Sequence, residues 1–228
     1  MSYPRIIAHR GGGFLAPENT LAGIALSARL GRRGVEFDVM LSRDGIPVLM
    51  HDETVDRTTD GSGPVAELTL SELRRLHAGG EPVPTLAEAL DLSQSLGLWI
   101  NVEIKPGSGQ EAGTGESTAR LLAARWAGPG VVSSFSEAAL VAARAAAPKL
   151  DYALLADDPP ADWPAQLDRL GCRALHCQAN RFLPGWAAAG IPIACYTVNE
   201  RPQAEALLAA GAAAVFTDRP DLWQAAEG

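Results

Sequence analysis

The chain repeats one local pattern about eight times: a short apolar segment of strand length, a turn, and a stretch whose apolar residues have helical spacing. This repetition predicts consecutive βα units and a parallel sheet. Eight such units close a barrel, so we expect an α/β fold, a TIM (β/α)8 barrel. An open doubly wound sheet is the alternative, ranked second because polar residues end both early and late strands. The expected strands are 5–8, 34–41, 98–105, 131–134, 152–155, 174–177, 192–196 and 214–217.

Capping signals indicate where two of the helices begin. Asn19 or Thr20 precedes an apolar-periodic stretch that we expect to form a helix to about residue 30. Thr85 and Glu88 have capping-box spacing before a second helix at 86–96. Further helices are expected at 137–146, 163–170, 183–189, 202–210 and 220–226.

Two segments interrupt this regularity. Residues 52–84 contain turn chemistry and one short helix at 70–76, so we interpret them as a small insertion after the second strand. The chain is then one barrel domain, residues 1–228, with that insertion. The glycine-rich segment 106–115 is a candidate lid.

Composition and charge exclude several classes of partner. The net charge of −8 argues against binding nucleic acid or anionic lipid through a broad basic surface. The chain has an odd number of cysteines, and they lack CxxC spacing, so we expect reduced thiols at Cys172, Cys177 and Cys195. We expect neither a secretory leader nor a membrane-spanning helix, because the first residues contain no long apolar segment and no stretch approaches about 18 uncharged apolar residues. We therefore expect a cytoplasmic protein without stable membrane association and without a nucleic-acid partner.

Two expected strands place ionisable side chains on one face. Successive strand residues point to opposite faces, so Glu36 and Asp38 share a face in the second strand. By the same parity Asn101, Glu103 and Lys105 share a face in the third. For Glu36 and Asp38 alone, a solvent-exposed strand face is the alternative. The polar residues that share one face of the third strand argue against it.

Carboxylates that converge inside a barrel require a cation, a proton or water. Glu36, Asp38 and Glu103 offer three oxygen ligands, which suit a hard divalent ion. We predict one such ion. Mg²⁺ is the preferred identity, and Ca²⁺ and Mn²⁺ are the alternatives. A zinc site would contain more His or Cys.

Two histidines end strands beside these acids. His9 follows the first strand and His51 follows the second, so a barrel would bring both to its rim. Histidine titrates near neutrality, and the pair could act as general base and general acid. A hydrogen-bonded structural histidine is the alternative for either one. His77 follows a short helix and is interpreted as a surface residue.

The formal charges in the predicted mouth suggest an anionic substrate. Three carboxylates, one divalent ion, Arg10 and Lys105 leave a net charge of +1, which one phosphodiester would cancel. Arg10 offers a planar fork to phosphate oxygens and Lys105 a point charge. Ion pairs between these cations and the carboxylates are the alternative reading, and both roles can coexist.

Taken together, the motifs resemble those of the glycerophosphodiester phosphodiesterase family, in the family's order along nearly the whole chain. The resemblance is greatest to its short cytosolic bacterial members associated with glycerol-3-phosphate uptake. The motifs are His9-Arg10-Gly11, Pro17-Glu18-Asn19-Thr20, Glu36-Phe37-Asp38, Asp44-Gly45, His51-Asp52, Glu103-Ile104-Lys105, Ser134-Phe135, Tyr196-Thr197-Val198-Asn199 and Thr217-Asp218.

The resemblance implies a function. Glycerophosphodiesters such as glycerophosphocholine and glycerophosphoethanolamine would be hydrolysed to an alcohol and sn-glycerol 3-phosphate. It further implies that His9 is the base and His51 the acid, although the residues alone permit the reverse. Phe135 and Tyr196 would contact the substrate, and many relatives carry Trp at the position of Tyr196.

Rival functions use similar residues. A phosphodiesterase acting on intact phospholipid headgroups shares this chemistry. A metal-dependent barrel isomerase or aldolase could also use inward carboxylates, and a non-catalytic binding module is the third alternative. The first nucleophile, water or a neighbouring glycerol hydroxyl, is left open.

Overall fold

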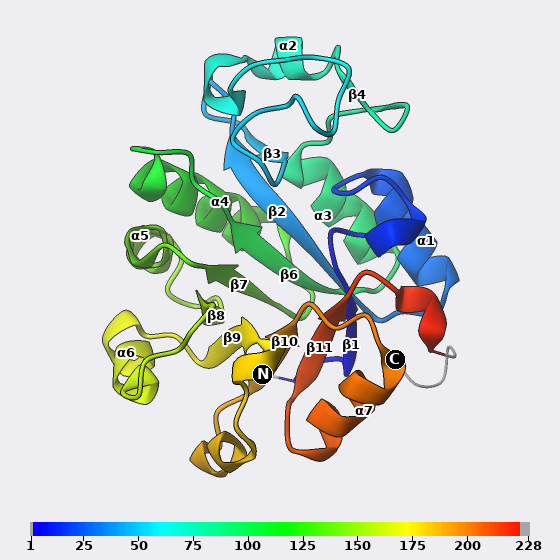
Figure 1. Ribbon diagram of the computed structural model, residues 1–228. Helices are drawn as coiled ribbons and strands as arrows, with labels where there is room; N and C mark the ends of the chain where they lie inside the picture. Colours follow the sequence, from blue (N-terminus) through cyan, green and yellow to red (C-terminus); the bar gives the residue numbers. More distant parts are fainter. Residues whose placement is uncertain (1, 224–228) are drawn as a thin grey trace.

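Eight parallel strands close into a barrel in the computed structural model, which describes residues 2–223 (Figure 1). Strand β1 pairs with both β11 and β2, so the sheet has no break in its ring. The expected TIM (β/α)8 barrel is confirmed. Its strands are β1 (Ile6–Ala8), β2 (Gly34–Leu41), β6 (Trp99–Ile104), β7 (Gly130–Ser134), β8 (Tyr152–Ala156), β9 (Ala174–Gln178), β10 (Ile193–Tyr196) and β11 (Ala214–Thr217).

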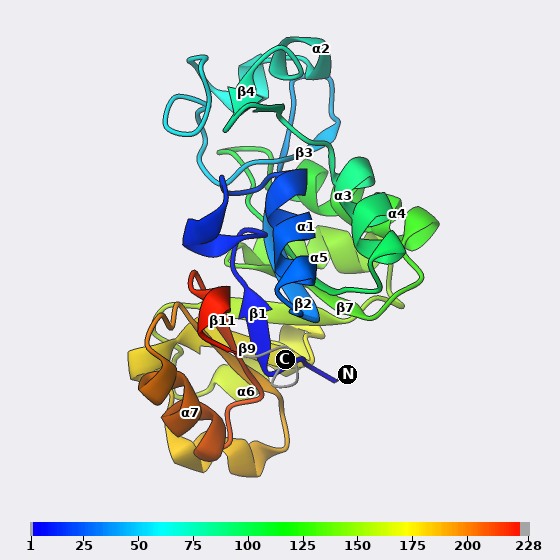
Figure 2. The ribbon, with the colours of Figure 1, turned by 90° about the vertical axis from the view of Figure 1, so that its right-hand side faces the viewer.

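Helices surround the barrel on its outer side (Figures 1 and 2). The Thr20 hydroxyl caps α1 by accepting from Gly23 N, and Thr85 with Glu88 forms the expected capping box of α3. The α-helices around the barrel are α1 (Leu21–Arg29), α3 (Leu86–Ser95), α4 (Glu111–Arg125), α5 (Glu137–Ala146), α6 (Trp163–Leu170) and α7 (Arg201–Ala209). Short 3₁₀ helices are η1 (Gly13–Leu15), η3 (Ala179–Arg181), η4 (Pro184–Ala189) and η5 (Pro220–Leu222).

The segment after β2 projects beyond the barrel, as expected for an insertion (Figure 2). Strand β3 (Pro47–Leu49) runs antiparallel to β2, and η2 (Val65–Glu67), α2 (Leu70–Leu73), β4 (His77–Ala78) and β5 (Glu81–Pro82) follow. The segment has a small apolar core that is separate from the barrel core. This core consists of Met40, Val48, Met50, Val55, Val65, Leu73 and Val83.

Several expected elements differ from the observed ones. The candidate lid is wrong over its second half, because residues 111–115 form the first turns of α4, a helix the sequence reading did not anticipate. Helix α2 ends three residues earlier than expected, and 184–189 is a 3₁₀ helix. In the last expected helix, 220–222 forms η5, and 224–226 lies outside the described residues.

The two faces of the strands have different neighbours. Val35, Phe37 and Val39 point outward from β2 into the apolar layer between the strands and the helices. Inside the barrel, near the amino ends of the strands, small residues leave room for larger side chains. They are Ala153, Ala174, Ala194 and Ala214. Trp99, Phe216 and Tyr3 contact them there, so this end of the barrel is filled. The polar site lies at the other end.

Among residues 2–223, we find no helix that is both long and apolar enough to cross a membrane.

Candidate active site

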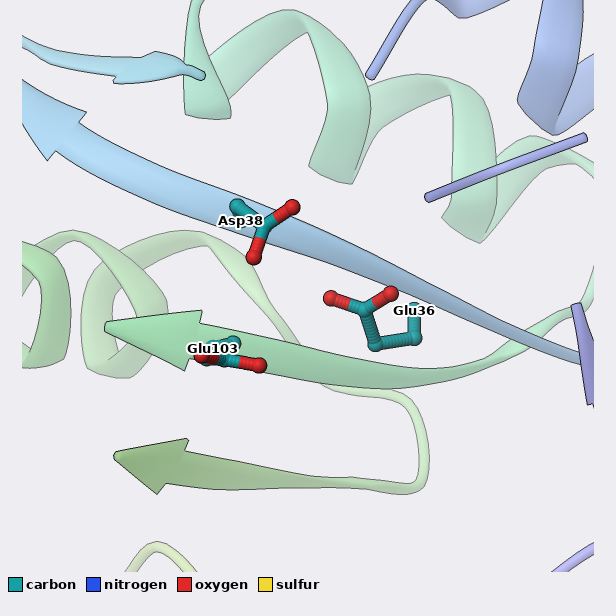
Figure 3. A group of neighbouring side chains, drawn as sticks. All are labelled: Glu36, Asp38 and Glu103. Atoms are coloured by element: carbon teal, nitrogen blue, oxygen red, sulfur yellow. The ribbon is translucent and has the colours of Figure 1, made fainter. Parts of the chain in front are cut away.

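Three carboxylates converge on the inward-facing side of β2 and β6 (Figure 3). Strands β2 and β6 are paired so that Asp38 is directly opposite Glu103, and Glu36 is two residues before Asp38 on the same face. One oxygen from each carboxylate lies within 4.8 Å of the others. All three side chains are buried, as the strand parity predicted.

The electrostatics of the cluster fit a bound cation. Burial, and then the charge of Asp38, raises the pKa of Glu36 to about 8 and that of Glu103 to about 7. Glu36 Oε1 is buried and has no hydrogen-bond partner. Buried carboxylates that repel one another, with an oxygen that no donor satisfies, are a favourable ligand set for a divalent ion. The residues present therefore fit a metal site.

The β1–α1 loop holds these acids in place. Asn19 Nδ2 donates to Asp38 Oδ2 at 2.8 Å, while Asn19 Oδ1 accepts from Asp38 N at 3.0 Å. Arg10 N donates to Glu36 Oε2 at 2.8 Å. Arg10 and Asn19 adopt left-handed backbone, with φ of 51° and 56°, which is uncommon for residues other than glycine. This strained loop conformation is what aims its donors at the cluster.

Gly13 lets the same loop contact the opposite end of the chain. Its φ is +57°, and a Cβ there would lie 2.3 Å from Asp218 O. The triple glycine therefore permits close approach of two backbone segments. Phe14 N donates to Asp218 O at 2.8 Å across this contact.

His9 is fixed by an aspartate that directly follows the last strand. Its Nδ1–H donates to Asp218 Oδ1 at 2.7 Å, and its Nε2 lies 3.9 Å from Glu36 Oε2. Burial lowers the His9 pKa, but the Asp218 hydrogen bond and the Glu36 charge outweigh it and raise the pKa overall. Asn199 in turn donates to Asp218 Oδ2 at 3.0 Å, which orients the carboxylate.

His51 is fixed by the residue that follows it. Its Nδ1–H donates to Asp52 Oδ1 at 2.6 Å, and its Nε2 accepts from Lys105 Nζ at 3.0 Å. Burial and the neighbouring Lys105 and Arg10 lower the His51 pKa, against the opposing effect of Asp38 and Asp52. Both histidines are thus anchored through Nδ1, whereas Nε2 of His51 is hydrogen-bonded to Lys105 and Nε2 of His9 lies beside Glu36.

The two predicted phosphate ligands are ion-paired in the structure. Arg10 Nη1 donates to Glu18 Oε1 at 2.9 Å, and Glu18 accepts two further hydrogen bonds, both from Arg57. Lys105 Nζ lies 3.1 Å from Glu103 Oε1. Lys105 therefore pairs with one of the three inward carboxylates, as the alternative had it. Arg10 pairs with Glu18, and its buried Nε makes no hydrogen bond but lies 3.8 Å from Asp38 Oδ2.

The ionisable residues predicted for the site line one cavity. Phe135 and Tyr196 form its aromatic corner, with ring centroids 6.1 Å apart in an edge-to-face arrangement. Every side chain predicted for the site lines this cavity: His9, Arg10, Glu36, Asp38, His51, Glu103, Lys105, Phe135 and Tyr196. His77 is exposed on β4 and is remote from this set.

Sequence reasoning did not assign roles to the residues that orient this set. Asp52 was interpreted as a turn residue, although its place directly after His51 was the available signal. Asp218 directly follows β11, where a barrel gathers its polar residues. His176 and Asn101 also line the cavity, and each has a buried atom without a hydrogen-bond partner.

Comparison with known proteins identifies the family. Residues 9–222 match the glycerophosphoryl diester phosphodiesterase family. A glycerophosphodiester phosphodiesterase of Caldanaerobacter subterraneus subsp. tengcongensis is 34% identical over 230 residues, which cover 95% of this chain and 94% of that protein. Human glycerophosphodiester phosphodiesterase 1 is 47% identical over 109 residues, which cover 43% of this chain and 33% of the human protein.

A solved structure has the same architecture. A phosphodiesterase from Oleispira antarctica, in complex with the product sn-glycerol-3-phosphate, is 37% identical with a TM-score of 0.92. The match covers 96% of this chain and 94% of that one. The matched family model extends over nearly the whole barrel and includes every residue of the cavity described above. The chain therefore belongs to the glycerophosphoryl diester phosphodiesterase family.

Proposed function

We propose that this glycerophosphodiester phosphodiesterase cleaves its substrates to an alcohol and sn-glycerol 3-phosphate with one divalent cation and a pair of histidines. The observation that carries the proposal is the convergence of three buried carboxylates with two strand-end histidines in one cavity. The Oleispira antarctica relative, with sn-glycerol-3-phosphate bound as its product, supports the same substrate class.

Glu36, Asp38 and Glu103 would hold the cation, and Mg²⁺ is the ion we propose because all three ligands are hard oxygens. When bound, the ion would offset the charge of the carboxylates and withdraw electron density from a phosphate oxygen. Its charge also bears on His9, whose pKa is raised in part by the anionic Glu36 and Asp38. The ion would offset this effect of Glu36 and Asp38 and so lower the His9 pKa, which favours the neutral ring that a base requires.

Arg10 and Lys105 would hold the phosphate. Glu18, clamped by Arg57, keeps the Arg10 guanidinium over the cavity. Lys105 reaches the same space from β6, beside Glu103. Because both cations lie near the place where negative charge builds during the reaction, they stabilise the transition state more than the ground state.

The two histidines would transfer the protons. His9 takes one from the nucleophile at Nε2, while Asp218 stabilises the resulting imidazolium at Nδ1. His51 gives one from Nε2 to the departing alkoxide. An anionic phosphate beside Lys105 and Arg10 offsets the two charges that lower the His51 pKa, so the bound substrate itself favours the protonated acid.

The test is a hydrolysis assay with purified protein. Glycerophosphocholine with Mg²⁺ should release glycerol 3-phosphate, and EDTA should abolish the reaction. Unchanged turnover in EDTA would contradict the metal site. A parallel assay with intact phosphatidylcholine tests the rival substrate class, and faster cleavage of the lipid than of its deacylated headgroup would reassign the substrate.

A further inference from the structure

The central cavity continues into two grooves of different chemistry. One groove shares His51, Lys105 and Phe135 with the cavity and reaches Glu53; we call it the Glu53 groove. The other shares Tyr196 and Thr197 with the cavity; we call it the amide groove. A diester bound at the centre has two arms, so each arm has a groove to enter.

The Glu53 groove is an apolar trough with one uncompensated charge. Its walls include Met40, Ile104, Pro106 and the ring of Phe135, which is 44% exposed. Glu103 and Lys105 also line it, but they pair with each other at 3.1 Å. Glu53 is exposed, and within residues 2–223 its carboxylate forms no ion pair.

The amide groove has the opposite character. Its lining is mainly polar and uncharged, with amide groups from Gln178, Asn180 and Gln203 and hydroxyls from Thr197 and Tyr196. Of these, Gln178 Nε2 and the Tyr196 hydroxyl donate to Asp157 Oδ1, which leaves the other groups for a ligand. Amides and hydroxyls both donate and accept hydrogen bonds, which suits a diol. The glycerol arm of the substrate fits this groove better than an apolar trough.

The position of His51 assigns the leaving alcohol to the Glu53 groove. His51 lines this groove and is absent from the lining of the amide groove. The proton donor must lie beside the departing oxygen, so the alcohol leaves on this side. Apolar walls beside one carboxylate suit an alkylammonium group. The ring of Phe135 contributes apolar surface, because Lys105 Nζ already lies over it, 5.8 Å from the centroid.

We propose that Glu53 is a specificity-determining residue that selects diesters whose leaving alcohol is positively charged, such as choline or ethanolamine. The inference rests on the proposed function, because the direction of departure follows from His51 as proton donor. The phosphate charge is met by Arg10 and Lys105, and the ammonium charge is met separately by Glu53. Each of the two charges of a zwitterionic substrate therefore faces side chains of the opposite charge.

The experiment compares two substrates that differ in the charge of the alcohol. We would measure kcat/KM for glycerophosphocholine and for glycerophosphoglycerol, whose leaving alcohol is neutral. Glu53→Gln should lower kcat/KM for glycerophosphocholine about fivefold, the upper range for an exposed ion pair, and leave glycerophosphoglycerol nearly unchanged. Glu53→Lys should reduce the first value further, because attraction becomes repulsion.

A matched control variant separates a direct contact between Glu53 and the leaving alcohol from an effect of the protein's net charge. Glu67 is an exposed acid of the same inserted segment and lines neither groove, so Glu67→Gln makes the same charge change elsewhere. Glu67→Gln should affect neither substrate. Equal effects of Glu53→Gln on both substrates, no effect on either, or a selective effect of Glu67→Gln would each overturn the inference. Failure of the proposed function is seen separately, as a wild-type protein that cleaves neither diester.

Discussion

At the scale of single residues, the site is built from two histidine–aspartate pairs, in each of which the carboxylate fixes Nδ1 of the ring. His51 donates to Asp52 and His9 donates to Asp218, at 2.6 and 2.7 Å. An imidazole held in this way has a defined tautomer and direction before the substrate arrives. The two rings are therefore oriented before the reaction begins, so no free energy is spent on orienting them during it.

Removing one of these rings tests its role directly. We expect His51→Ala to lower kcat for glycerophosphocholine by about 100-fold or more, the usual scale for a general acid. His77→Ala is the matched control, because His77 lies exposed on β4 with its ring beside Asp60. Steady-state kinetics and circular dichroism check the result, and a rate within twofold of wild type would assign the acid to another group.

At the scale of elements, strand parity predicted which face the three carboxylates occupy. It did not predict the long-range contacts around them. Glu36, Asp38 and Glu103 were predicted to face inward because a strand alternates strictly, and the backbone register enforces it. The link from His9 to Asp218 joins residues 209 positions apart, and no local periodicity encodes such a contact. Only the closure of the barrel brings them together.

Helix α4 was missed for a different reason. Its first turns contain Gly113, Thr114 and Gly115, residues with weak helix propensity that are typical of loops. Tertiary packing overrides this preference. A Cβ at Gly115 would lie 2.3 Å from Ala139 O of α5, so the glycine permits the close contact between the two helices.

Two glycines of α4 give opposite predictions for the same substitution. Gly115→Ala should lower the free energy of unfolding by roughly 1–3 kcal/mol, because the methyl group meets the α5 backbone. Gly113→Ala should raise it by about 0.5–1 kcal/mol, because that site is nearly open and alanine favours the helix. Urea unfolding of both variants checks this, and equal effects would show that packing does not distinguish the sites.

At the scale of the whole molecule, stability depends on pH through groups that the barrel interior encloses. His176 is fully buried and pairs with Tyr3 through Nε2 at 2.9 Å. Burial lowers the His176 pKa to about 3. Between that value and about 6.5 the unfolded chain binds a proton that the folded chain does not, so this contribution to stability is lost as pH falls.

A difference measurement isolates this contribution. In Mg²⁺, the free energy of unfolding of wild type minus that of His176→Gln should be constant above pH 6.5. Below it, the difference should fall by up to about 1.4 kcal/mol per pH unit. Thermal or urea unfolding from pH 4.5 to 8 supplies the data. A pH-independent difference would show that His176 binds its proton equally well in the folded state.

The contact between His9 and Asp218 also has a consequence for biosynthesis. A nascent chain on the ribosome acquires His9 first and Asp218 more than two hundred codons later. Until translation passes β11, the first histidine lacks its carboxylate and the ring of strands has a gap. We therefore expect hydrolytic activity only from chains that extend past Asp218, and a message terminated before that codon should yield inactive protein.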